Sequence, residues 1–142
     1  MELYTSCPEE TFAEAKKLAE GLNPGDVICM YGDLGAGKTL FAQGIASGLG
    51  IDESVSSPTF TIVNEYMGRI PFYHFDVYRI SDPDEMYEIG FDEYLFGEGV
   101  CLVEWAELIE DVLPDKYIKV TIERDSANPE LNRIIIIEKI GF

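Results

Sequence analysis

The chain has 142 residues, of which 46% are apolar, enough to bury one core, and we expect a single domain over residues 1–142. The formal net charge is -17, from 27 acidic and 10 basic residues. Because affinity for phosphate backbones comes from Lys and Arg, this charge argues against direct nucleic-acid binding, so any such role is expected to be indirect. It favours solubility and a partner with a basic surface.

Apolar runs are short. The runs at residues 27–31 and 134–137 fall far below the roughly 20 residues that a bilayer helix needs. The first residues lack the basic start and apolar core of a secretory signal, so we expect a cytoplasmic protein with no membrane segment. The odd set of cysteines without close pair spacing indicates reduced thiols, at Cys7, Cys29 and Cys101.

The first half of the chain predicts a helix, a strand and a second helix. Residues 6–9 have the S-x-x-E form of a capping box, and apolar residues follow at helical spacing from Phe12 to Leu22. Residues 27–31 form a continuous apolar run, typical of a strand buried on both faces. A glycine-rich segment follows, and apolar residues then recur on one helical face from Lys38 to Leu49.

The second half predicts mainly strands. Residues 59–66 and 70–78 are β-branched and aromatic and indicate a hairpin. Residues 81–85 form the start of a short helix that ends at Gly90. Residues 100–103 form another buried strand.

The C-terminal part adds two strands. They cover residues 116–123 and 133–138, with a turn around residues 128–129. Together the elements predict an α/β layer fold with a mixed sheet.

The glycine-rich segment carries the strongest chemical signal. Gly32-x-x-x-x-Gly37-Lys38-Thr39 matches the phosphate-binding P-loop, between a strand and a helix as that motif requires. Glycines let backbone N–H groups approach phosphate oxygens, Lys38 reaches the β- and γ-phosphates, and the Thr39 hydroxyl can ligate Mg²⁺. We therefore expect a P-loop NTPase-like three-layer sandwich with a mixed central sheet. The predicted nucleotide-binding residues of this segment are Asp33, Leu34, Gly35, Ala36, Gly37, Lys38, Thr39 and Leu40.

A nucleotide-bound Mg²⁺ takes one or two oxygen ligands from the protein. Asp76 and Glu104 each stand at the end of an apolar run, where ligands of parallel sheets bind, and Glu104 is the better-placed of the two. The sequence leaves open which carboxylate ligates Mg²⁺ and which orients an attacking water. Thr59 either contacts the γ-phosphate or belongs to a simple turn.

Two aromatic residues flank these acids. We interpret His74, the single histidine, as a structural strand residue. Trp105 is a core residue, a nucleotide-facing residue or a partner contact, and the core interpretation is favoured.

Four segments of the chain together resemble the TsaE (YjeE) family. They are the runs YGDLGAGKT at 31–39, SPTF at 57–60, HFDVYR at 74–79 and LVEW at 102–105. The resemblance implies an ATPase of bacterial tRNA modification that binds ATP or ADP with Mg²⁺. It implies TsaD and TsaB as partners, which attach threonylcarbamoyl to an adenosine beside the anticodon. Contact with tRNA is then only indirect, and ATP hydrolysis resets the complex rather than performing the transfer.

The resemblance also implies residue roles. Lys38 and the loop amides hold the phosphates, and Lys38 takes part in catalysis. Thr39 and Glu104 hold Mg²⁺, and Asp76 assists hydrolysis. Thr11, in the first helix, is implied on the adenine side of the nucleotide.

Other functions remain alternatives. A small-molecule kinase of this class needs a basic lid, but no basic residue occurs between Arg79 and Lys116. A regulatory GTPase would carry an Asn-Lys-x-Asp element, which the sequence lacks after the P-loop. A nucleotide-gated binding module with negligible turnover differs from an ATPase mainly in rate.

Overall fold

The computed structural model describes residues 1–32, 37–56, 58 and 62–142. Its elements are β1 (Glu2–Thr5), α1 (Pro8–Glu20), β2 (Val27–Gly32), α2 (Lys38–Gly48), β3 (Val63–Met67), β4 (Pro71–Asp76), α3 (Glu85–Glu88), α4 (Phe91–Leu95), β5 (Val100–Glu104), the 3₁₀ helix η1 (Ala106–Val112), β6 (Tyr117–Arg124) and β7 (Arg133–Ile140).

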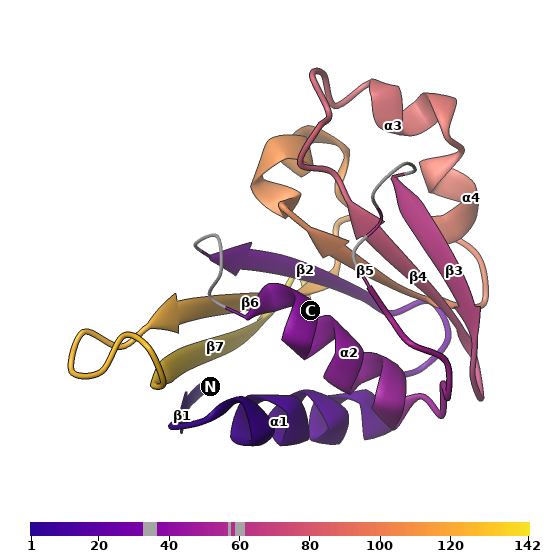
Figure 1. The fold of residues 1–142 in the computed structure, drawn as a ribbon. Helices are drawn as coiled ribbons and strands as arrows, with labels where there is room; N and C mark the ends of the chain where they lie inside the picture. Colours follow the sequence, from indigo (N-terminus) through magenta and orange to yellow (C-terminus); the bar gives the residue numbers. More distant parts are fainter. Residues whose placement is uncertain (33–36, 57, 59–61) are drawn as a thin grey trace.

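Within the described residues, the strands form a seven-stranded sheet in the order β1-β7-β6-β2-β5-β4-β3. β2 pairs in parallel with β5 and β6, β4 pairs in parallel with β5, and the other neighbours are antiparallel. Helices α1 and α2 lie together on one side of the sheet (Figure 1), and α3 and α4 pack into the cluster on its other face, with residues of β2, β4 and β5. The predicted mixed sheet and α/β fold class are confirmed.

The position of β2 between two apolar clusters explains why its run of apolar residues is continuous. Ile28 and Met30 pack into the apolar cluster under α1 and α2, whereas Val27, Cys29 and Tyr31 belong to the cluster on the opposite face. A strand with a core on both sides needs apolar residues at every position, which is why the run is continuous rather than alternating. Strand β5 shares both clusters in the same way.

Most predicted elements are confirmed. At the starts of two helices, a glutamate of the helix accepts the hydrogen bonds of the residues before it. The helix α1 begins at Pro8 with Cys7 as its N-cap, and Glu10, not Glu9, accepts hydrogen bonds from the Ser6 amide and hydroxyl, both at 2.7 Å. The predicted S-x-x-E box is therefore wrong by one residue. Similarly, Glu85 accepts the amides of Ser81 and Asp82, so the helix's own carboxylate closes its first turn.

Three elements escape the sequence patterns. The strand β1 has four residues and pairs only with β7, from the opposite end of the chain. The short helices α4 and η1 have one or two turns, too few for a periodic pattern to stand out. None of these three elements carries a predicted site residue.

No helix in the described part of the chain is long and apolar enough to cross a bilayer. All three cysteines are free, and two of them are buried in the sheet. Burial raises the pKa of the Cys29 thiol and raises that of Cys101 to about 12. Since the thiolate is the reactive form, burial in the core protects these two thiols, and their raised pKa values keep them in the less reactive neutral form.

We predict that only Cys7 of the native protein reacts readily with an aromatic disulfide reagent at about pH 8. Cys29 and Cys101 should react at least about tenfold more slowly, because they need an opening of the sheet. Thiol titration with and without denaturant measures this directly. Cys7→Ser should abolish the fast phase and Cys101→Ser should leave it intact. Rapid labelling of all three thiols in the native protein would contradict the buried placement.

Candidate functional site

The predicted site residues converge because three neighbouring strands are parallel. β2, β5 and β4 end at Gly32, Glu104 and Asp76, and in a parallel sheet those ends share one edge. Met30 and Asp76 are both register partners of Glu104. The Val77 amide donates to the Glu104 carbonyl oxygen at 3.3 Å, which ties the chain after β4 to the end of β5.

The start and end of the glycine-rich segment have backbone conformations that suit glycine. Gly32 has φ 131°, and a Cβ there would lie 2.2 Å from the carbonyl oxygen of Ile122 on β6. Gly37 has φ 111° and is the N-cap of α2, so the positive end of that helix dipole faces the site. The remaining predicted residues of the loop and the γ-phosphate candidate lie outside the described residues: Asp33, Leu34, Gly35, Ala36 and Thr59.

The Lys38 side chain lies across this edge and is 5% exposed. Its Nζ donates to the Gly32 carbonyl oxygen at 3.0 Å and lies 3.6 Å from the ring centroid of Trp105. Trp105 has φ 64°, a left-handed conformation that residues other than glycine rarely adopt. Its indole also contacts the ring of Tyr78, at 4.9 Å between centroids. Trp105 is therefore partly buried against the core and faces the lysine of the P-loop motif.

Thr39 and Glu104 are brought together as a hydroxyl and a carboxylate. Thr39 Oγ1 lies 3.4 Å from Glu104 Oε1, and Glu104 is only 3% exposed. The other oxygen, Oε2, lies 2.5 Å from His74 Nε2. Hard oxygen donors of this kind suit Mg²⁺. Among the described residues no group of three or more His, Cys, Asp and Glu side chains could hold a metal ion.

Asp76 lies beside this pair and is partly exposed. Its Oδ1 accepts the Tyr78 amide at 3.1 Å, which fixes the carboxylate at the end of β4. Desolvation raises the pKa of Asp76, and the nearby Glu104 carboxylate raises it further, against the lowering effects of the Tyr78 amide, His74 and Lys38. Two neighbouring carboxylates that repel each other form a place where a cation lowers the electrostatic energy.

A small hollow of about 50 Å³ adjoins the start of α2 on another side. Thr11 and Leu40 line it together with Gly37, the β6–β7 connection contributes Leu131, and the start of β7 contributes Arg133. The Thr11 hydroxyl is buried and lies 2.7 Å from that of Thr5. Sequence reasoning missed the contribution of residues after Arg124, because only the folded hairpin brings them next to the P-loop helix.

The description of the matching family model is "Threonylcarbamoyl adenosine biosynthesis protein TsaE", and the match covers residues 5–135. The chain belongs to the TsaE family. The resemblance carried by the four sequence segments is thereby confirmed.

Curated relatives named tRNA threonylcarbamoyladenosine biosynthesis protein TsaE support the assignment. The Bacillus subtilis (strain 168) protein is 56% identical over 118 residues, 82% of this chain and 73% of the relative. The Treponema pallidum protein is 43% identical over 101 residues, 71% and 75% of the two chains. The crystal structure of Bacillus subtilis YdiB matches with a TM-score of 0.80 and 43% identity, covering 100% of this chain and 86% of that chain.

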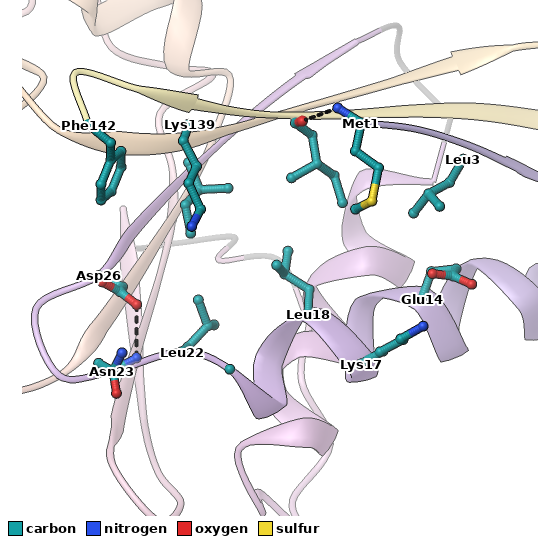
Figure 2. Close-up of a pocket in the computed structure, with 13 residues that line it drawn as sticks. Met1, Leu3, Glu14, Lys17, Leu18, Leu22, Asn23, Asp26, Lys139 and Phe142 are labelled. Carbon is teal, nitrogen blue, oxygen red and sulfur yellow. Dashed lines mark hydrogen bonds between the residues drawn. The ribbon is translucent and has the colours of Figure 1, made fainter.

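A second cavity, of about 500 Å³, lies away from the candidate site of this TsaE-family chain. Figure 2 shows Leu18 of α1 and Leu22, which follows that helix, facing Met1 and Lys139 across it. None of the described candidate site residues lines this cavity.

The contact between Lys38 and Trp105 can be detected optically because the chain has one tryptophan. We predict that Lys38→Ala changes the intensity and wavelength of Trp105 emission in the nucleotide-free protein, since the ammonium leaves the indole face. The matched control is Lys119→Ala, which removes an ammonium from the ring of Tyr31 instead. Identical emission spectra of wild type and Lys38→Ala would contradict the contact.

Proposed function

We propose that this chain binds ATP or ADP with Mg²⁺ and hydrolyses ATP, as a component needed to form threonylcarbamoyladenosine in tRNA. In this proposal it acts with TsaD and TsaB in the cytoplasm and does not perform the transfer itself. The names of its relatives support the pathway. The contact of Thr39, at the start of α2, with the buried Glu104 carries the nucleotide assignment, because it joins a phosphate-binding helix end to a metal-binding carboxylate.

Each described residue has a role in this proposal. The Lys38 ammonium and the N-terminus of α2 bind the phosphates. The Thr39 hydroxyl and the Glu104 carboxylate would hold Mg²⁺, which when bound neutralises charge that develops on the phosphates. Asp76, at the neighbouring strand end, would accept a hydrogen bond from the attacking water and orient it.

The base of the nucleotide is proposed to lie toward the hollow beside Thr11 and Leu40. Leu131 gives that hollow an apolar wall, and Gly37 joins it to the phosphate end of the site. In such a site the phosphates would lie at the N-terminus of α2, and the base would lie in the hollow beside the same helix turn. The charged phosphates would thus contact polar groups, whereas the base would contact an apolar wall.

The acidic surface supports the partner part of the proposal. With a net charge of -17, the chain is suited to dock on a basic protein surface and unsuited to hold tRNA directly. In this arrangement the partners bind the tRNA, and this chain contributes nucleotide turnover.

The alternative is a nucleotide-gated binding module with negligible turnover of its own. One observation favours it: the Lys38 ammonium already contacts the Gly32 carbonyl and the Trp105 ring, and a phosphate would have to displace them. A small-molecule kinase is less well supported, because the segment between Arg79 and Lys116 lacks basic residues for a lid.

Lys38→Ala should weaken ATP binding by roughly 1.5–3 kcal/mol, about 10- to 150-fold, since it removes a charged hydrogen-bond donor from the phosphates. Isothermal titration calorimetry measures the affinity. Lys119→Ala has the same net charge, and its lysine lies over the ring of Tyr31, so it should bind ATP normally. Equal affinities for wild type and Lys38→Ala would remove the basis of the nucleotide assignment.

Glu104→Gln should lower ATP hydrolysis by about a hundredfold while nucleotide affinity without metal changes little, because only the metal-dependent step loses a ligand. Phosphate release is measured for the chain alone and with TsaD and TsaB. Stimulation by the partners supports the proposed ATPase. Turnover that stays negligible with the complete complex would favour the binding module, and equal loss of binding and hydrolysis would contradict the metal role of Glu104.

A further inference from the structure

We propose that His74 is a positioning residue that fixes the Glu104 carboxylate for the divalent cation accompanying the nucleotide. This inference rests on the proposed function, in which Glu104 is a metal ligand. It assigns a specific task to the single histidine of the chain, which sequence reasoning treats as a structural residue of the strand.

The two side chains meet between adjacent strands. His74 lies on β4 and Glu104 at the end of β5, and the register pairs His74 with Leu102, two residues before Glu104. Residues two apart on a strand point to the same face, so the imidazole and the carboxylate lie on the same side of the sheet. That side carries the cluster under α1 and α2, which includes Leu102 and Phe72.

The contact is short and fully shielded from water. His74 Nε2 lies 2.5 Å from Glu104 Oε2, with His74 at 0% and Glu104 at 3% exposure. Because an ionised carboxylate can only accept, Nε2 carries the hydrogen and donates it. Charge-assisted hydrogen bonds in a low-dielectric interior are stronger than exposed ones, so this contact holds the carboxylate firmly.

The contact divides the two oxygens of Glu104 between different neighbours. Oε2 accepts from His74, while Oε1 lies 3.4 Å from the Thr39 hydroxyl at the start of α2. With Oε2 held, rotation of the carboxylate is restricted, and Oε1 stays directed at Thr39. A metal ligand with one fixed oxygen and one directed oxygen is pre-organised, which is what partners behind metal ligands provide.

The histidine's surroundings point to the same task. Its Nδ1 is buried and has no hydrogen-bond partner in the described part of the chain. Its ring lies 6.1 Å from that of Phe72, in a stacked arrangement. The Glu104 contact is therefore the polar interaction that the structure shows for this ring, and an apolar side chain would fill the same space without an unsatisfied nitrogen.

Two substitutions of His74 test whether a hydrogen-bond donor at this position must reach the Glu104 carboxylate. His74→Gln places an amide nitrogen near the position of Nε2 and should still donate to Glu104, whereas His74→Asn ends too short to reach it. Mn²⁺ serves as the probe, and its affinity for the ADP complex is measured by electron paramagnetic resonance. We expect His74→Asn to weaken Mn²⁺ binding by roughly 10- to 100-fold and His74→Gln to restore most of it. ADP affinity without metal should be the same in all three proteins.

Phe72→Leu is the control for altered packing around the ring, because it leaves the His74 donor in place. It should lower the unfolding temperature without changing Mn²⁺ affinity. If His74→Asn does not fold, His74→Met, which fills the space without a donor, gives the same comparison with His74→Gln. Equal Mn²⁺ affinity in the Asn, Gln and wild-type proteins would overturn the inference.

Glu104→Gln distinguishes this inference from the proposed function. If Glu104→Gln weakens Mn²⁺ binding and His74→Asn does not, the positioning role of His74 fails while the metal site stands. If Glu104→Gln itself leaves Mn²⁺ affinity unchanged, the metal assignment in the proposed function fails, and the role of His74 fails with it.

Discussion

The candidate site depends on one constraint, the parallel pairing of β2, β5 and β4 in a fixed register. This pairing brings the P-loop motif and the Glu104 and Asp76 carboxylates, distant in sequence, to the same edge of the sheet. A slip of one residue in β5 would turn Glu104 to the opposite face, away from Thr39 and α2. The apolar residues of β5, which alternate between the two cores, oppose such a slip, so the register that positions the carboxylate is held by packing on both faces.

The site concentrates buried charge, and each charged group has a partner. Lys38 is held by the Gly32 carbonyl and the Trp105 ring, and Glu104 by His74 and Thr39. A buried charge without such contacts would cost several kcal/mol. The site therefore holds an ammonium group and the N-terminus of α2 together with two carboxylates. These groups suit an anion and a cation that bind together.

The sequence predicts the arrangement of strand and helix on either side of the glycine segment because that arrangement is local. Strand, glycine segment and helix follow one another directly, and the special backbone conformations at Gly32 and Gly37 need the residue type that the motif specifies. The carboxylates could also be predicted, because each ends a buried apolar run. The task of His74 could not, since its donor meets Glu104 only through the β4–β5 register, and a lone histidine in a strand reads as core. The contact of Trp105 with Lys38 is tertiary in the same way.

The hollow beside α2 could not be predicted from any short segment of the sequence. Its walls come from α1, from the first turn of α2 and from the connection after β6, three segments that no short motif joins. Phosphate is recognised mainly by backbone groups and one cation, which a contiguous segment can supply. A base is recognised by shape and by a few side chains, which only the assembled fold can gather. A short sequence motif can therefore predict a phosphate site, whereas the hollow proposed for the base forms only where the β6–β7 connection and α1 meet the start of α2.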